Sequence, residues 1–410
     1  MSTPSSATAV TGIGMISPAG IGKDANWATI LAGAGTAASH ESIDHHGQRR
    51  PIARVPEFDA RKVIGASKAW RLARFVQLAI IAAREAISDS GVDLDSIEAS
   101  RIGLVFGNSL GGTDTFEAAT GTLLTEGAEQ VSPMLVPMWM PNMVAGSLAI
   151  EFGIQGPAHV VATACASGTT AIGHGRQLLR DGRCDIVVVG ASESALSPAT
   201  LAGLANMGAL VDPAVNATGA SRPFDTQRGG FVPAEGAAAL ILERDADARA
   251  RNARVYAHVA GYGASTDAHH VTAPRPDGEG LQAAVREAVE DDAGLALGDI
   301  GHINAHGTST PLNDASEGAA LHGLFGDRVP VTSIKGVTGH PLAAAGAIEG
   351  AIAALTVHHG QIPPTANTDD IDPAIAIDVV TGSARPLESG AVLSVSAGFG
   401  GHNAAVVFTP

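Results

Sequence analysis

The segment Val160–Gln177, VVATACASGTTAIGHGRQ, joins a strand-like run to a helix through Cys165 and decides how the rest of the chain is interpreted. Val and Ala precede the cysteine, and the Ser, Gly and Thr behind it are small enough for a helix to begin in tight packing. A cysteine at a helix N-terminus lies among unpaired backbone N–H groups, which favour the thiolate over the thiol. The pattern predicts a nucleophile at Cys165, while a buried structural cysteine explains this segment alone equally well.

Length and composition indicate a large globular protein. Its 410 residues exceed the roughly 250–300 residues at which single cores stop growing, so we expect two domains or a duplicated one. A formal charge of −16 repels phosphate backbones, which disfavours a nucleic-acid partner. Cys165 and Cys184 are the only cysteines, too few for a disulfide framework or a thiolate metal cage. These features predict a reduced compartment.

The chain also lacks the usual signs of export or membrane insertion. The N-terminal sequence MSTPSSATAV has no basic region followed by an apolar core. No later run approaches the roughly 18 apolar residues that span a bilayer. We therefore expect a cytoplasmic protein without a membrane segment.

The two halves of the chain share four motifs in the same order, which predicts a duplicated α/β fold. The corresponding segments are 9–17 with 255–266, 101–112 with 299–310, 160–177 with 329–350, and 184–194 with 390–401. Strands that alternate with helices predict doubly wound, mostly parallel units, 1–253 and 254–410, with their helices packed on each other. An insert at about 112–158 occurs only in the first half, and its length is typical of functional segments.

The repeat also predicts a site, because ligands bind beyond the carboxyl ends of parallel strands. The loops there carry Cys165, His306 in NAHGTST, His340 in SIKGVTGHP and Phe399 in GFGGHN, with Lys335 five residues before His340. Two imidazoles, a thiol and an adjacent ammonium lack the ligand set of a zinc site, so we expect no metal. The N–H groups of Phe399 and Cys165 outline an oxyanion hole, although GFGGHN could also be a simple glycine-rich turn.

These motifs resemble those of the β-ketoacyl-acyl-carrier-protein synthases, from about residue 8 to residue 408. The similar segments are TACASG around Cys165, NAHGTSTPLNDASE around His306, SIKGVTGH around Lys335 and His340, and GFGGHN. The resemblance implies a thiolase-like duplicated fold of five layers, αβαβα, that is normally dimeric. It also implies a decarboxylative Claisen condensation, with substrates carried by acyl-carrier protein and without a cofactor.

The resemblance assigns roles to individual residues. Cys165 accepts the acyl chain, His306 and His340 polarise the malonyl thioester carbonyl and stabilise the enolate, and Lys335 and Glu317 organise the two histidines. The remaining implied roles are pantetheine binding by Thr308 and Thr310, and gating of malonyl entry by Phe399. Stabilisation of the developing oxyanion agrees with the general logic of such reactions.

The chain departs from close relatives near the gate and the expected acyl tunnel. Ala397 stands where relatives have an aromatic residue and Val395 where they have an amide, while Gly208 replaces an arginine that contacts carrier protein in some relatives. Leu110 and Met138–Met140 fall where relatives have the tunnel and the dimer interface, although such residues are often plain core. We expect Ala397, together with the group of Leu110 and Met138–Met140, to set which acyl chains are accepted.

Four basic residues are expected to dock the acidic carrier protein: Lys62, Lys68, Arg71 and Arg74. Positions 68, 71 and 74 recur every third residue, which predicts a shared helix face. An ordinary solvated face is the alternative.

Other functions fit the sequence less well. By resemblance, degradative thiolases carry a second cysteine in the C-terminal glycine loop, and GFGGHN has none. Chain-initiating synthases use one histidine and an asparagine, and the non-catalytic chain-length subunit lacks the nucleophile. A nucleotide-binding scaffold is disfavoured because no strand precedes a full GxGxxG or GxxxxGK[ST] motif. The pathway, the acyl chain length, and the choice between a homodimer and a heterodimer with a cysteine-free chain-length subunit stay open.

Overall fold

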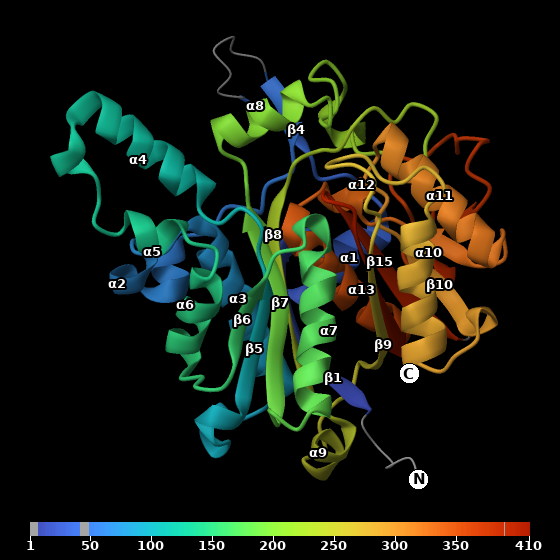
Figure 1. Ribbon diagram of the computed structural model, residues 1–410, viewed down its shortest axis with the longest axis horizontal. Coiled ribbons are helices and arrows are strands. Elements are labelled where there is room, and N and C mark those ends of the chain that lie inside the picture. The colour runs from blue at the N-terminus through green and yellow to red at the C-terminus, as the bar shows by residue number, and fades with distance from the viewer. Residues whose placement is uncertain (1–6, 42–48, 389) are drawn as a thin grey trace.

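The computed structural model describes residues 7–41, 49–388 and 390–410. The prediction about the N-terminus falls in part on residues 1–6, which lie outside the described residues. A twelve-stranded sheet organises the described chain (Figure 1). Its path is β13(Asp378–Val379)-β11(Pro330–Thr332)-β10(Ile300–Asn304)-β15(Ala391–Gly398)-β16(His402–Thr409)-β9(Ala257–Thr266)-β1(Thr8–Ser17)-β8(Glu235–Arg244)-β7(Ile186–Ser194)-β5(Ile102–Gly107)-β6(Ala158–Val161), with β2(Gly20–Ile21) paired to β1.

The strand order confirms the internal repeat. From the central pair outward, β1-β8-β7-β5-β6 in one half corresponds to β9-β16-β15-β10-β11 in the other. The expectation of mostly parallel units holds only in part. The runs β7-β5-β6 and β15-β10-β11-β13 are parallel, whereas β8 and β16 run antiparallel to both of their neighbours and β1 is antiparallel to β9. In the second half the cause is local: β15 and β16 are joined through Gly400 and Gly401, both at positive φ, and such a tight hairpin must reverse the chain.

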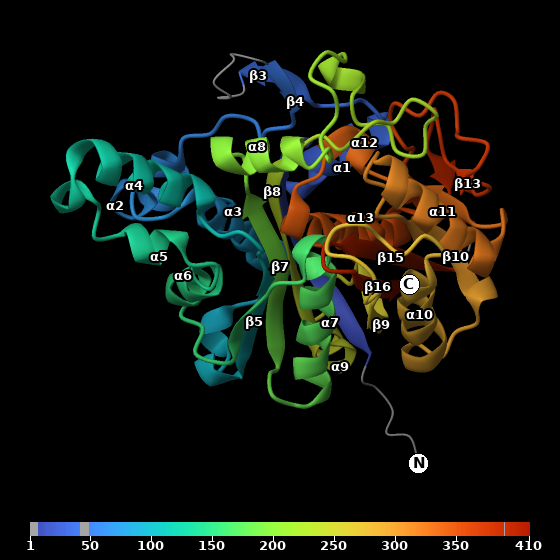
Figure 2. The same ribbon diagram turned by 45° about the horizontal axis from the view of Figure 1, so that its top comes forward.

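Helices form three layers around the two halves of the sheet (Figures 1 and 2). One outer layer contains α3(Arg74–Ser90) and α6(Met143–Phe152), and the other contains α10(Glu279–Arg286) and α11(Pro311–Phe325). Between the halves lie α7(Ser167–Arg180) and α13(Ala345–His359). This arrangement confirms the predicted five-layered αβαβα fold.

Equivalent glycines in the two halves let an outer helix approach a central strand. A Cβ on Gly12 would lie 2.1 Å from the carbonyl oxygen of Ala86 on α3. A Cβ on Gly261 would lie 2.0 Å from the carbonyl oxygen of Ala288, in the turn that continues α10. Any side chain at either position would therefore push the helix off the sheet, so the GIG and GYG motifs have the same packing role.

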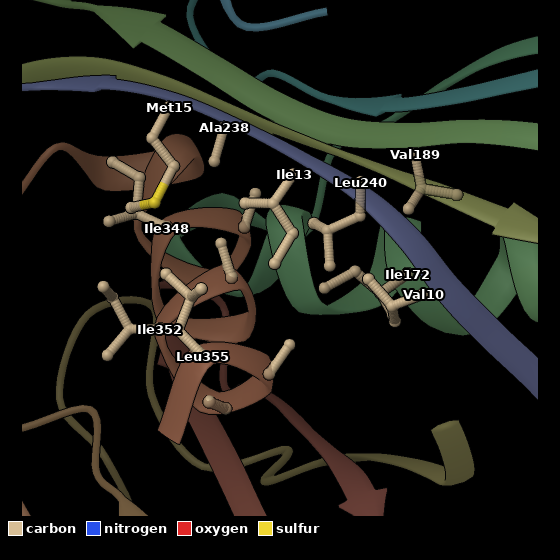
Figure 3. Packing of buried hydrophobic residues seen from close by; sticks show 14 of the residues in the cluster. Val10, Ile13, Met15, Ile172, Val189, Ala238, Leu240, Ile348, Ile352 and Leu355 are labelled. Atoms are coloured by element: carbon tan, nitrogen blue, oxygen red, sulfur yellow. The ribbon is translucent and has the colours of Figure 1, made fainter. Parts of the chain in front are cut away.

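The central helix α13 packs against both halves. Its Ile348, Ile352 and Leu355 belong to one buried cluster with Met15 and Ile13 of β1 and Ile172 of α7 (Figure 3). By length and composition alone the stretch Leu342–His359 could cross a membrane, so the prediction that no such run occurs was wrong. The interior of the protein buries 78% of this stretch, as is typical of a core helix.

The insert at 112–158 is largely helical and projects from the body of the molecule (Figure 1). It forms α4(Thr113–Glu126), α5(Leu135–Trp139) and α6 before reaching β6. Six of its large apolar side chains are at least 39% exposed: Phe116, Leu123, Leu124, Val136, Trp139 and Ile150. Phe116 and Trp139 among them pack together, with ring centroids 4.7 Å apart, and contiguous exposed apolar side chains are typical of an interaction surface.

Shorter elements complete the described chain. They are α1(Lys23–Ala32), α2(Ala66–Ala69), α8(Pro198–Asn206), α9(Asp245–Ala250), α12(Lys335–Thr338), the pair β3(Ala38–Glu41) and β4(Arg49–Ile52), and the pair β12(Gln361–Ile362) and β14(Arg385–Pro386). The proposed boundary at 253/254 falls between α9 and β9 and stays a prediction.

Candidate active site

The predicted nucleophile lies in a single turn of 3-10 helix, Ala164–Ala166, directly before α7. Cys165 is 6% exposed, and the backbone N–H of Phe399 donates a hydrogen bond to its sulfur. Burial raises the pKa of Cys165 to about 12, although the Lys335 ammonium and the Phe399 N–H act in the opposite direction. The expectation of a resting thiolate was therefore wrong, because desolvation outweighs the helix start. At neutral pH Cys165 is a thiol that requires a base.

Two buried histidines stand beside this thiol. His306 follows β10 and His340 follows α12; they are 2% and 3% exposed, and their ring centroids are 5.2 Å apart. One ligand atom from each of Cys165, His306 and His340 lies within 4.8 Å of the other two. Burial, together with the positive charge of Lys335, lowers both histidine pKa values well below 6.5. Both imidazoles are neutral at pH 7 and can exchange a proton with the thiol.

Lys335 determines how His306 is protonated. Its Nζ lies 3.2 Å from His306 Nδ1 and 2.5 Å from the His306 carbonyl oxygen. Because an ammonium group can only donate, Nδ1 of His306 accepts and the ring proton is assigned to Nε2. The His306 ring can therefore act as a hydrogen-bond donor through Nε2.

Glu349, on the central helix α13, is a site residue that sequence reasoning missed. Its Oε1 pairs with Lys335 Nζ, and each of the two side chains is 1% exposed. The sequence feature that could have identified Glu349 is its position as a single acidic residue within a long run of small and apolar residues, AAAGAIEGAIAAL. A charged side chain on the buried face of a core helix needs a partner of opposite charge.

The predicted carboxylate Glu317, on α11, acts on the backbone of the histidine loop. It accepts hydrogen bonds from the N–H groups of His306 at 2.6 Å and Gly307 at 2.7 Å. Burial raises the pKa of Glu317 to about 7. Glu317 thus fixes the loop that carries His306, whereas Lys335 contacts the ring itself.

The thiol and both histidines open onto a cleft that also contains Thr308, Thr310, Ala397 and Phe399, with Met207 and Gly208 among its other wall residues. The hydroxyls of Thr308 and Thr310 are 2.8 Å apart. Thr310 also caps α11, because its Oγ1 accepts the N–H of Asn313 at 3.3 Å. Leu110 is 38% exposed and does not line this cleft, and Met138 lines a separate groove beside Lys68 and Arg71.

The docking residues Lys68, Arg71 and Arg74 do not share one helix face as predicted. Lys68 ends α2 and Arg74 begins α3, while the extended backbone of Ala73 separates the two helices. Lys68 pairs with Glu151 at 2.6 Å, and Arg74 forms a two-pronged ion pair with the buried Glu235. The shared-face prediction was wrong because threefold spacing aligns charges only within an unbroken helix.

Lys62, Lys68 and Arg71 are the exposed members of the predicted docking set, and 54% of the Lys68 side chain is open to solvent. Arg71 donates to the Ser67 carbonyl oxygen and lies over the exposed ring of Trp70, 5.3 Å from its centroid. The Lys62 side chain is 84% exposed, with Asp59 3.9 Å away.

The cluster of Cys165, His306 and His340 is also the group of potential metal ligands found in the described part of the chain. The Lys335 ammonium, 3.2 Å from His306 Nδ1, would repel a cation placed there. A catalytic zinc site normally presents three ligands free of such a neighbouring charge. The donor set therefore fits acyl transfer better than metal binding.

Comparison with known proteins shows the family of the chain. The N-terminal domain of β-ketoacyl synthases matches residues 6–248, and the C-terminal domain matches residues 256–369. The chain belongs to the β-ketoacyl synthase family, and it is an acyltransferase of the ketosynthase class with a thiolase-like fold.

Its relatives include 3-oxoacyl-[acyl-carrier-protein] synthase 2 of Staphylococcus aureus, which is 39% identical over 97% of this chain and 100% of its own length. A type II polyketide ketosynthase, solved in complex with its acyl-carrier protein, superposes with a TM-score of 0.91 at 28% identity, covering 99% of this chain and 100% of that one. The ishigamide ketosynthase/chain length factor superposes with a TM-score of 0.90 at 32% identity and 98% coverage of each chain.

Proposed function

We propose that this protein elongates acyl chains by decarboxylative condensation with malonyl-acyl-carrier protein, in fatty-acid or type II polyketide synthesis. The observation that carries the proposal is that Cys165, His306 and His340 line one cleft, with one sulfur or ring nitrogen atom of each within 4.8 Å of the other two. The family membership and the named relatives support the same reaction.

In the first half-reaction the Cys165 thiol attacks the carbonyl carbon of an acyl-carrier thioester. A neutral imidazole of the site accepts the thiol proton and passes it to the departing pantetheine sulfur, so no net proton is consumed. The N–H groups of Cys165 and Phe399 are placed to stabilise the tetrahedral oxyanion, with Phe399 already directed at the cysteine sulfur. The neutral state of both histidines is what permits this proton transfer.

In the second half-reaction malonyl-acyl-carrier protein enters between Thr308 and Phe399. Cleavage of its carboxyl bond releases carbon dioxide and leaves an enolate, whose oxygen accepts hydrogen bonds from His306 Nε2 and from His340. The enolate carbon attacks the acyl-Cys165 thioester, the β-ketoacyl product forms on the carrier, and the cysteine thiolate takes up one proton. A neutral donor suits this step because it stabilises the developing negative charge without giving up its proton.

The reaction assignment is tested by intact-mass measurement and peptide mapping after incubation with acyl-carrier thioesters. We expect one acyl group on Cys165 and none on Cys184, which is fully buried against Gly103 of β5. Cys165→Ala should abolish acylation, whereas Cys184→Ala is the matched control and should retain it. An acyl group on Cys184, or one that persists in Cys165→Ala, would contradict the proposal.

The carrier protein is proposed to dock at Lys62, Lys68, Arg71 and Arg74. Of these, Lys62, Lys68 and Arg71 face solvent, although Lys62 lies 3.9 Å from Asp59 and Lys68 pairs with Glu151. Arg74 is held by the buried Glu235. The overall charge of −16 makes a local basic patch necessary for an acidic partner.

A second thiolase-fold chain is the proposed structural partner, either another copy or a cysteine-free chain-length subunit. The apolar surface of the insert supports pairing, and so does the exposed edge strand β6, where Ala158 and His159 are open to solvent. The ketosynthase/chain length factor relative favours the heterodimer. Native mass spectrometry of the chain alone and after co-expression with a cysteine-free paralogue distinguishes the two assemblies.

The proposed chemistry needs neither metal nor cofactor, and the proposed compartment is the cytoplasm. The residues at the site supply nucleophile, base and oxyanion donors by themselves. Condensation activity should be unchanged after treatment with a chelator, and its loss would contradict this part of the proposal.

A further inference from the structure

The residue immediately before the nucleophile has an unusual backbone conformation. Ala164 has a φ of 50°, in the left-handed region that non-glycine residues rarely adopt. Such a conformation is energetically unfavourable for alanine and persists only where the surroundings enforce it. Because Cys165 is the next residue, the turn at Ala164 sets the direction of both the Cys165 side chain and its N–H.

Two serine hydroxyls hold this turn. The carbonyl oxygen of Ala164 accepts hydrogen bonds from Ser167 Oγ at 2.6 Å and from Ser109 Oγ at 3.1 Å. Ser167 Oγ also accepts the N–H of Thr163 at 2.9 Å. Both lone pairs of the Ala164 carbonyl are therefore used, which fixes the peptide group between Ala164 and Cys165. The peptide group before Ala164 is fixed by the Thr163 carbonyl oxygen, which accepts the N–H of Ala166 at 3.0 Å.

Ser109 reaches the turn from a different strand, and a buried carboxylate holds it there. Glu193, near the end of β7, is fully buried and accepts the N–H groups of Ser109 at 3.0 Å and Leu110 at 3.2 Å. Asn108, at the end of β5, donates to Glu193 at 3.2 Å and to the Ser192 carbonyl oxygen at 2.7 Å. The loop after β5 is thus tied to β7, and this leaves the Ser109 hydroxyl directed at Ala164.

We propose that Ser109 and Ser167 are positioning residues for the nucleophile: they hold Ala164 in its left-handed turn and thereby aim Cys165, with Glu193 anchoring Ser109. The inference rests on the proposed reaction and assigns these residues to its first half-reaction, acyl transfer to Cys165. Acyl transfer to Cys165 depends on the direction of the sulfur and of the oxyanion N–H. Malonyl decarboxylation depends on His306 and His340, which none of the three residues contacts in the described hydrogen bonds.

The test separates these two half-reactions. Ser109→Ala should slow acylation of Cys165 by an acyl-carrier thioester about three- to tenfold, the range set by loss of one hydrogen bond. Malonyl decarboxylation, measured with and without Ser109→Ala in a Cys165→Gln background, should stay within about twofold. Ser100→Ala is the matched control, because Ser100 is an exposed serine whose hydroxyl meets only the nearby Glu98.

A rescue variant distinguishes positioning from a general loss of structure. Glycine adopts the left-handed conformation without steric cost, so Ala164→Gly added to Ser109→Ala should recover most of the lost acylation rate. Acylation of Ser109→Ala at the wild-type rate would overturn the proposal. An equal fall in both half-reactions, without rescue by Ala164→Gly, would also overturn it.

The proposed reaction can fail independently of this inference. If no carrier thioester acylates the wild-type protein, the function is wrong, and the crystal structures of Ser109→Ala and Ser167→Ala then decide the positioning role. An Ala164 that leaves the left-handed region in either variant supports that role, and an unchanged Ala164 in both refutes it.

Discussion

Replacing Lys335 by methionine should make the stability of the protein fall more steeply with rising pH than it does in the wild type. The substitution keeps most of the side-chain volume and removes the only charge that the structure places against the Glu349 carboxylate. Both side chains are 1% exposed, so water cannot replace the lost ammonium. Burial already raises the pKa of Glu349 above its usual 4.5, and without Lys335 that pKa must rise further.

The size of the effect follows from the cost of keeping a buried carboxyl protonated. Each pH unit above 4.5 at which Glu349 must hold its proton costs about 1.4 kcal/mol, or about 4 kcal/mol at pH 7.5. This agrees with the roughly 3–5 kcal/mol typical of breaking a buried ion pair. Since the folded state of the variant binds a proton that the unfolded state releases, stability is highest near pH 4.5 and falls as pH rises.

Thermal unfolding measured between pH 5 and pH 8 tests this reasoning. We expect the unfolding temperature of Lys335→Met to fall steadily relative to wild type across this range, and Lys335→Met/Glu349→Gln to remove the pH-dependent part of the loss. If Lys335→Met unfolds in parallel with wild type at every pH, Glu349 is not isolated with Lys335, and the assignment of a closed buried pair is refuted. The double variant should stay inactive, because His306 still lacks its Nδ1 donor.

Three further predictions address the nucleophile, the acyl pocket and the docking surface. Because burial raises the pKa of Cys165 to about 12, its alkylation by iodoacetamide should quicken about tenfold per pH unit from pH 7 to pH 9; a plateau below pH 8 would indicate a thiolate instead. Ala397→Phe should shift the preferred acyl length or unsaturation, measured with a series of acyl-carrier substrates, because Ala397 lines the cleft; an unchanged preference would remove Ala397 from the specificity determinants. Arg71→Glu should raise the KM for carrier-linked substrate about three- to tenfold at low salt and leave small thioester analogues unaffected. Arg286→Glu, on an exposed face of α10, is the control, and equal effects on both substrates would exclude docking at Arg71.

Much of the fold could be predicted from the sequence because the internal repeat consists of short sequence patterns that can be recognised one at a time. Strand-like runs, glycines and small-residue helices recur in the same order in both halves, and β1 and β9 carry the matching GIG and GYG motifs. Each pattern depends on neighbouring residues alone. The direction of a strand, in contrast, depends on how the chain connects it to its neighbours in the sheet. The antiparallel orientation of β8 and β16 was therefore not predicted.

The sequence by itself determined which residues are proposed to supply the chemistry: Cys165, His306, His340 and Lys335 lie in short motifs that are recognisable without the structure. Only the tertiary structure decided the protonation states of these residues and the ion pair that holds Lys335. The helix start suggested a thiolate, whereas burial among packed elements makes Cys165 a thiol and both histidines neutral. Glu349, close in sequence to His340, gains its role only because α13 carries it to Lys335 in the interior. Desolvation and ion pairing depend on the total surroundings of a group, and those surroundings come from segments that are distant along the chain.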